Sequence, residues 1–140
     1  MEPMTDAVGL SIELRYLIYA CLWLAVLWIP YILAHIGKVG IVQALGYAEG
    51  DVAMPVWARR LKRAHYNLVE NIVPFAVAVG AGEILNVHNN LTATCALIIL
   101  IARLVHPFAQ VAAIWGTRTV TFAVGWVAMM IYLLAIIGWL

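Results

Sequence analysis

Four stretches of about 20 apolar residues constrain the fold of this chain more than any other feature. Residues 16–36 and 120–140 contain no Asp, Glu, Lys or Arg, whereas 64–85 contains Glu70 and 91–114 contains Arg103. One helix needs roughly 20 mostly apolar residues to cross the hydrocarbon core of a bilayer. Only 11% of all residues are charged and 66% are hydrophobic, which excludes both a water-soluble globule and a disordered chain. The sequence therefore predicts an all-α integral membrane protein, a bundle of four transmembrane helices.

We expect a single membrane domain over residues 1–140, with helices at about 12–36, 60–85, 91–114 and 117–140. The connection 37–59 contains four glycines and Pro55, so it is interpreted as a turn-rich loop rather than a further domain. The flank before the first apolar run is acidic, so this run is expected to remain as the first helix instead of being cleaved as a signal peptide.

Basic residues predict the orientation in the membrane. They border the first and third loops: Lys38, Arg59, Arg60, Lys62, Arg63 and Arg118. By the positive-inside rule these loops are cytoplasmic and both termini lie outside. The net charge of +1 provides no field that would attract nucleic acid. A compact chain without a targeting extension suits a bacterial inner membrane, and the spacing of Cys21 and Cys95 predicts neither a disulfide framework nor a metal site.

Two polar stripes run along the middle helices. At about 100° of rotation per residue, Asn67, Glu70 and Pro74 fall within about 40° of Arg63, and Glu70 lies roughly 10 Å deeper than Arg63. In the next span Arg103, His106 and Gln110 follow at offsets of three and four, which places them on one face. The two stripes therefore predict a polar groove that descends from the cytoplasmic surface.

Ionisable residues inside a membrane are by default candidates for a functional site. Arg103 requires an anion, and the partner expected for it is Glu70. A buried pair that only fixes helix register would explain these two residues but not the remaining polar side chains of the stripes. Guanidinium groups bind carboxylates and Glu70 can bind an ammonium, so we expect a small zwitterionic ligand that is anionic overall. Lipophilic molecules would reach the same groove from the bilayer.

The stretch Arg63-Ala64-His65, with Asn67, Glu70-Asn71 and Pro74-Phe75 after it, resembles the signature of the membrane-associated proteins in eicosanoid and glutathione metabolism, the MAPEG family. These include microsomal glutathione transferases, leukotriene C synthase and microsomal prostaglandin E synthase. Ala102-Arg103-Leu104-Val105-His106 and Arg118-Thr119-Val120-Thr121 resemble the next two helices of that family. The resemblance covers nearly the whole chain.

The resemblance implies a homotrimer that binds glutathione as co-substrate between subunits, near the cytoplasmic side, and acts on a lipophilic second substrate as a transferase or peroxidase. It implies that Glu70 pairs with the glutathione amino group and that Asn67 hydrogen-bonds the tripeptide. Arg118 would stabilise the thiolate as the catalytic residue, because a positive charge lowers the pKa of a thiol. The other residues implied to contact or support glutathione are Arg63, Arg103, His106, Thr119 and, from a neighbouring subunit, Lys38.

One position departs from the family. Its synthases and several of its transferases have a tyrosine four residues after the position of His106, where this chain has Gln110. An amide cannot act as a phenol, so glutathione binding is expected to survive this change more easily than high activity or eicosanoid synthesis.

Three alternatives remain open from the sequence. One is a catalytically weak or inactive protein with the MAPEG fold, and another is a small proton-coupled drug transporter. Such transporters usually have their essential carboxylate in the first span, where this chain has none within 16–36. The third is a haem-binding bundle that uses His35, His65 or His106. His65 and His106 point in unrelated directions on the helical wheel, and we expect neither haem nor a metal.

Overall fold

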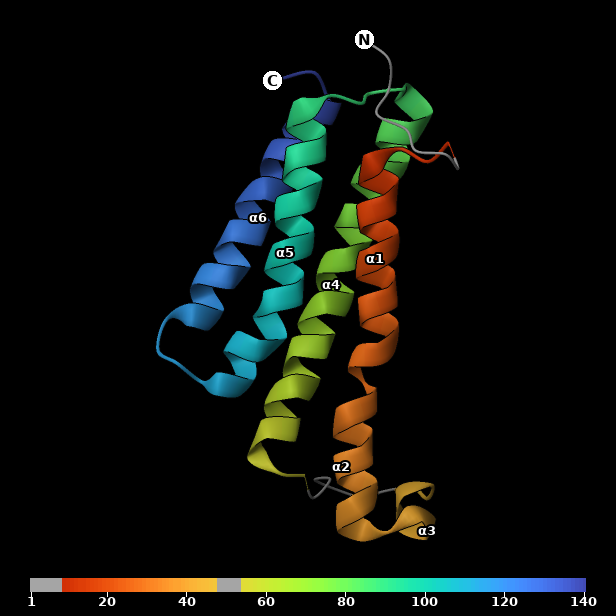
Figure 1. Cartoon of the computed structure of the whole chain (residues 1–140), viewed down its shortest axis with the longest axis vertical. Helices are drawn as coiled ribbons and strands as arrows, with labels where there is room; N and C mark the ends of the chain where they lie inside the picture. The colour runs from red at the N-terminus through yellow and green to blue at the C-terminus, as the bar shows by residue number, and fades with distance from the viewer. Residues whose placement is uncertain (1–8, 48–53) are drawn as a thin grey trace.

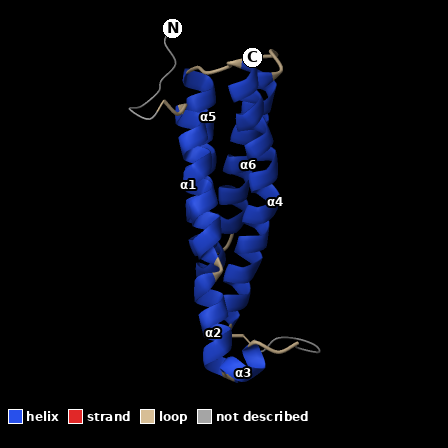
Figure 2. Ribbon diagram, turned by 90° about the vertical axis from the view of Figure 1, so that its right-hand side faces the viewer, coloured by secondary structure: helices blue, strands red, loops and turns tan. Residues whose placement is uncertain are grey.

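The computed structural model describes residues 9–47 and 54–140, and within these ranges every regular element is a helix (Figures 1 and 2). The helices are α1 (Ile12–Leu27), α2 (Ile29–Val39), α3 (Ile41–Ala44), α4 (Val56–Leu85), α5 (Asn90–Ala112) and α6 (Thr117–Ile136). Four segments are long and apolar enough to cross a membrane: α1 together with α2, then α4, α5 and α6. The prediction of an all-helical protein with four spanning helices is confirmed for the described part of the chain.

The first span differs in detail from the single helix expected over 12–36. It consists of α1 and α2, which meet at Trp28, and Pro30 occupies the first turn of α2. A proline has no N–H to donate and its ring displaces the preceding turn, so the helical hydrogen bonds are interrupted here. Within the predicted loop 37–59, α2 continues to Val39, α3 follows, and α4 begins at Val56. Residues 48–53 of that loop lie outside the described residues.

The helices form an elongated bundle in which α5 packs against α1, α4 and α6. The start of α1, the α4–α5 loop and the end of α6 lie together at one end, which we call the α4–α5 end (Figure 1). The opposite end, which we call the α3 end, holds α2, α3, the start of α4 and the α5–α6 loop. There α2 and α3 extend beyond the α5–α6 loop (Figures 1 and 2).

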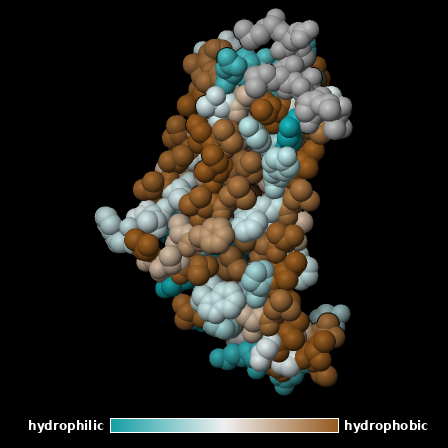
Figure 3. Space-filling view, viewed as in Figure 1, coloured by the Kyte–Doolittle hydropathy of each residue, from teal (hydrophilic) through white to brown (hydrophobic). Residues whose placement is uncertain are grey.

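The surface of the bundle is suited to lipid. Apolar residues cover most of the face seen in Figure 3, and the strongly hydrophilic residues gather toward its two ends. Large apolar side chains such as Leu22, Val77 and Ile101 are exposed along the spans. Inside, the rings of Phe75 and Tyr132 meet edge to face at a centroid distance of 6.5 Å. A hydrophobic exterior around a packed core identifies an integral, multi-pass membrane protein.

Candidate functional site

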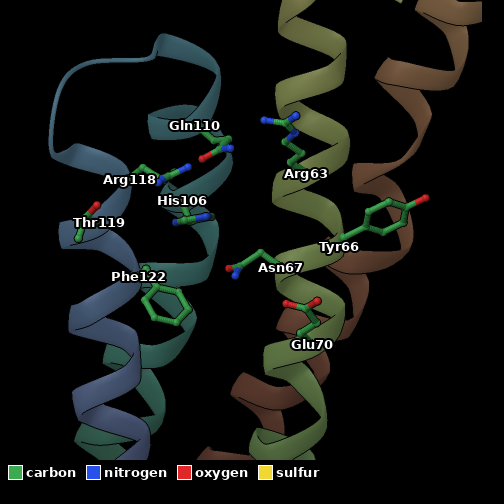
Figure 4. Close-up of a pocket in the computed structure, with 9 residues that line it drawn as sticks. All are labelled: Arg63, Tyr66, Asn67, Glu70, His106, Gln110, Arg118, Thr119 and Phe122. Atoms are coloured by element: carbon green, nitrogen blue, oxygen red, sulfur yellow. The ribbon is translucent and has the colours of Figure 1, made fainter. Parts of the chain in front are cut away.

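A cavity of about 490 Å³ lies between three helices toward the α3 end (Figure 4). We call it the polar cavity. Its lining comes from α4, α5 and α6: Arg63, Tyr66, Asn67, Glu70, His106, Gln110, Arg118, Thr119 and Phe122. The two polar stripes expected from the sequence therefore do converge, and the first turn of α6 closes a third side.

The α4 wall of the polar cavity follows from helical spacing. Arg63, Asn67 and Glu70 are separated by four and three residues, which places them on one side of α4. Arg63 and Asn67 point toward α5 and α6 in Figure 4. Within the described residues no hydrogen bond or ion pair joins the side chains of Arg63, Glu70 or Arg118 to another protein group, and all three are exposed in a single subunit. These charges are therefore available to a partner from outside the subunit.

Arg103 does not pair with Glu70, so that expectation is wrong. The Arg103 side chain is 3% exposed and donates from Nη2 to Asn71 Oδ1 at 2.9 Å and from Nη1 to Asn67 Oδ1 at 3.4 Å. Its guanidinium carbon lies 5.4 Å from the centroid of the Phe122 ring. Asn71 faces inward toward α5, whereas Glu70 is exposed. The guanidinium of Arg103 is therefore bound by two side-chain amides rather than by a carboxylate. Arg103 thus lies behind the polar cavity and holds Asn67, which lines it.

Gly125 explains how a buried guanidinium fits between α5 and α6. A Cβ atom at this position would lie 2.9 Å from Arg103 Nη2 and 3.1 Å from the Cβ of Ala102. Any side chain at position 125 would therefore displace Arg103. The sequence could have indicated this contact, because Gly125 lies in the last apolar span at the depth of Arg103, the only arginine in the third span.

The His106 ring is oriented by Thr121. His106 Nδ1 lies 3.0 Å from Thr121 Oγ1, and that hydroxyl also reaches the carbonyl oxygens of Thr117 and Arg118 at 3.0 Å each. A hydroxyl has one proton, so Thr121 either donates it to the backbone and accepts from His106 Nδ1–H, or donates it to His106 Nδ1. In both tautomers the contact fixes the ring and leaves His106 Nε2 on the wall of the polar cavity.

Gln110 is a further unpaired group in the polar cavity. Its Oε1 is buried and has no hydrogen-bond partner. Buried polar atoms are rarely left without a partner in folded proteins, so this oxygen indicates a ligand or water position.

Most of the site residues predicted from the sequence meet at the polar cavity. Seven line it: Arg63, Asn67, Glu70, His106, Gln110, Arg118 and Thr119. Arg103 supports it from behind, and Lys38 is exposed in the last turn of α2 and does not line the cavity of its own subunit. Tyr66 and Phe122 were missed, although Phe122 follows Arg118 by one helical turn and could have been found by that spacing.

His65 is engaged in a contact away from the polar cavity. His65 Nδ1 lies 2.8 Å from the hydroxyl of Tyr31, on the side of α4 that faces α2. Among residues 9–47 and 54–140, no group of three or more His, Cys, Asp or Glu side chains is arranged to hold a metal ion.

A second set of polar groups lies at the α4–α5 end, and sequence reasoning missed it. Thr92 Oγ1 donates to Glu13 Oε1 at 2.6 Å, and His88 Nδ1 lies 3.4 Å from Glu13 Oε2. His88 Nε2 lies 3.8 Å from Glu83 Oε2, and the Ser11 hydroxyl donates to Glu83. We call these five residues the closed network. The sequence feature that could have indicated this network is Glu83, an acidic residue inside a predicted span and five residues before His88.

Comparison with known proteins places the chain in a family. The model of the MAPEG family matches residues 17–138, a range that includes every residue of the polar cavity. No curated protein and no solved structure matches the chain.

Proposed function

The chain belongs to the MAPEG family of membrane proteins related to glutathione and eicosanoid metabolism, and we propose that it is a glutathione transferase or peroxidase acting on lipophilic electrophiles. The observation that carries the proposal is the set of unpaired charges in the polar cavity, Arg63, Glu70 and Arg118. Glutathione has one ammonium and two carboxylates, so one acidic and two basic side chains are complementary to it.

Each wall of the polar cavity offers a distinct contact. Glu70 accepts from the amino group of glutathione, and Arg63 binds a carboxylate. Asn67, held by Arg103 at 3.4 Å, hydrogen-bonds a peptide group. His106 Nε2 hydrogen-bonds the tripeptide, and the unpaired Oε1 of Gln110 accepts from one of its donors.

Arg118 and Thr119, in the first turn of α6, are the groups assigned to the sulfur. The guanidinium favours the thiolate over the thiol and so lowers the pKa of the bound thiol, while the hydroxyl donates a hydrogen bond to the sulfur. In conjugation the thiolate forms a carbon–sulfur bond with the electrophile. The proton lost from the thiol is returned to the leaving group or to the product.

Assembly into an oligomer, the homotrimer that the family resemblance implies, is supported by the exposure of charged side chains. Glu70 is exposed in a single subunit although it lies in the middle of a spanning helix, and a neighbouring subunit would shield it from the hydrocarbon core. Lys38, at the end of α2, is assigned to the cavity of a neighbour. The α3 end, which holds most of the basic residues, is assigned to the cytoplasm of a bacterial cell.

Gln110 favours a second candidate, a MAPEG protein that binds glutathione without turnover. An amide is a weaker substitute for the family's phenol beside a sulfur. Under this alternative the polar cavity would keep its ligand, and the thiol would not be activated.

Calorimetric titration of the purified full-length protein with glutathione, followed by assays with chlorodinitrobenzene and cumene hydroperoxide, tests both candidates. Saturable binding with turnover of either substrate is the expected result. Binding without turnover would select the inactive alternative, and the absence of binding would overturn both.

A further inference from the structure

A second cavity, of about 640 Å³, opens at the mouth of the polar cavity. The two share Arg63, Gln110, Arg118 and Thr119, and the second adds Arg60. We call it the arginine vestibule. Three guanidinium groups line it and, among the described residues, no acidic side chain does. Its charge is therefore more positive than that of the polar cavity, where Glu70 offsets part of the same charge.

Arg60 is fixed in place although it takes no part in the polar cavity. Its Nη1 donates to the backbone carbonyl of Val111, in the last turn of α5, at 3.3 Å. One contact leaves most of the five donors of a guanidinium free. Arg60 does not line the polar cavity proposed to bind glutathione, so its free N–H donors are available to a different ligand in the vestibule.

A third cavity, of about 580 Å³, continues from the vestibule along α5 and α6 and is almost wholly apolar. The two share Ala109, Ile114, Trp115, Gly116 and Val120. Beyond this shared rim the lining includes Val105, Phe108 and Ala112. The combined site is thus cationic at one end and apolar at the other.

The position of the combined site relative to the spans fits a membrane surface. Trp115, in the α5–α6 loop three residues after the end of α5, is 97% exposed, and tryptophan is enriched where the hydrocarbon core meets water. Phe108 and Val105, also exposed, lie on α5 on the span side of Trp115. A ligand with its charge at the arginines would therefore have its apolar part beside the lipid-facing surface of α5.

We infer that the arginine vestibule and the apolar cavity together bind an anionic phospholipid. The headgroup phosphate contacts Arg60, Arg63 and Arg118, and one acyl chain lies along Val105, Phe108 and Val120. Basic pockets between helices at a cytoplasmic membrane surface are suited to such headgroups, and guanidinium groups bind phosphate through paired hydrogen bonds. A phospholipid has both parts that the combined site accommodates, whereas a free phosphate uses only one.

A regulatory consequence rests on the proposed function. Because Arg63 and Arg118 line both the vestibule and the polar cavity, an anionic lipid and glutathione compete for them. Anionic lipid in the surrounding leaflet would then lower the apparent affinity for glutathione, whereas a zwitterionic lipid would not.

Lipid retention tests the binding inference without glutathione. The full-length protein is equilibrated in micelles with equal amounts of phosphatidylglycerol and phosphatidylcholine, and the lipids that remain after purification are quantified by mass spectrometry. We expect phosphatidylglycerol to be preferred, and Arg60→Gln to reduce that preference about fivefold. Arg59→Gln is the matched control, because Arg59 is the neighbouring exposed arginine of α4 and lines neither cavity. Equal losses in the two variants, or no preference in the wild type, would overturn the inference.

Two further arms identify the source of the phosphate and separate the inference from the proposed function. Glycerol phosphate, which has the headgroup chemistry without acyl chains, should fail to displace phosphatidylglycerol, and efficient displacement would contradict a lipid ligand. Adding phosphatidylglycerol should weaken glutathione binding about fivefold in the wild type and Arg59→Gln but not in Arg60→Gln. A protein that retains phosphatidylglycerol selectively but binds no glutathione would refute the proposed function alone.

Discussion

Glu13, at the α4–α5 end, is 2% exposed, accepts from Thr92 and lies 3.4 Å from His88 Nδ1, whereas Glu70, in the polar cavity, is exposed and has no side-chain partner among the described residues. Both carboxylates lie on spanning helices. The closed network around Glu13 joins the start of α1 to α4 and α5 through Glu83, His88 and Thr92.

The difference separates two uses of polar groups in a membrane bundle. Groups that satisfy one another inside the subunit stabilise its fold, because loss of one leaves another buried without a partner. Groups that converge on a cavity with unused donors and acceptors are available to a ligand. Substitutions at the two ends should therefore affect different properties, and stability should be separable from binding.

The largest effect is expected for Glu13→Ala. It removes the buried carboxylate that accepts from Thr92 and lies 3.4 Å from His88 Nδ1, and breaking such a buried polar contact costs about 3 kcal/mol. Thermal unfolding followed by circular dichroism should show a lower midpoint, with glutathione affinity unchanged in the folded protein. Glu13→Gln retains an acceptor for Thr92 and should be less destabilised. A Glu13→Ala protein of normal stability would contradict the structural role of the closed network.

Glu70→Gln should show the converse pattern. Removing the charge that pairs with the glutathione ammonium is expected to weaken binding about 30-fold, equivalent to about 2 kcal/mol, while the unfolding midpoint stays the same. Calorimetric titration measures the affinity. A clear fall in stability with unchanged affinity would place Glu70 in the same class as Glu13.

Gln110→Tyr tests whether the departure from the family limits activity. A phenol at this position offers a hydrogen bond to the thiolate, and we expect kcat with chlorodinitrobenzene to rise about tenfold. Affinity for glutathione should change little, since Gln110 is one of several polar contacts. A fall in kcat would show that the amide is itself adapted to the reaction.

The smallest effect is expected for Thr121→Val, which removes the hydroxyl that lies 3.0 Å from His106 Nδ1. His106 then loses its fixed orientation, and glutathione binding should weaken about threefold. Thr121→Ser keeps the hydroxyl and should restore the wild-type affinity. If serine and valine variants bind equally, Thr121 does not position His106.

The sequence was sufficient for the spans and for the convergence of the two polar stripes, because helical periodicity alone places Arg63, Asn67 and Glu70 on one face. It did not determine the partner of Arg103. A buried arginine is expected to pair with a carboxylate. The rotation of α4 about its axis instead presents Asn71 to Arg103 on α5 and leaves Glu70 exposed at the polar cavity. The rotation of α4 about its axis depends on the packing of the whole bundle and cannot be predicted from the sequence of one helix.

The closed network was missed for a related reason. Ser11 and Glu13 are far from Thr92 in the sequence, and all three look like ordinary residues at helix starts, where Ser11 does cap α1 and Thr92 does belong to the capping box of α5. Only the antiparallel arrangement of α1, α4 and α5 brings them together with Glu83 and His88. Similarly, the break between α1 and α2 depends on Pro30, which interrupts the helical hydrogen bonds without interrupting the apolar run of residues 16–36.

The central claim is that the polar cavity activates glutathione, and the most direct measurement is stopped-flow absorbance at the thiolate band after mixing the purified protein with glutathione. We expect a saturable thiolate signal in the wild type. Arg118→Ala should abolish this signal while retaining most of the calorimetric binding, because Arg118 is assigned to the sulfur and Glu70 to the amino group. Saturable binding with no thiolate in the wild type, or a thiolate signal that survives Arg118→Ala, would contradict the claim.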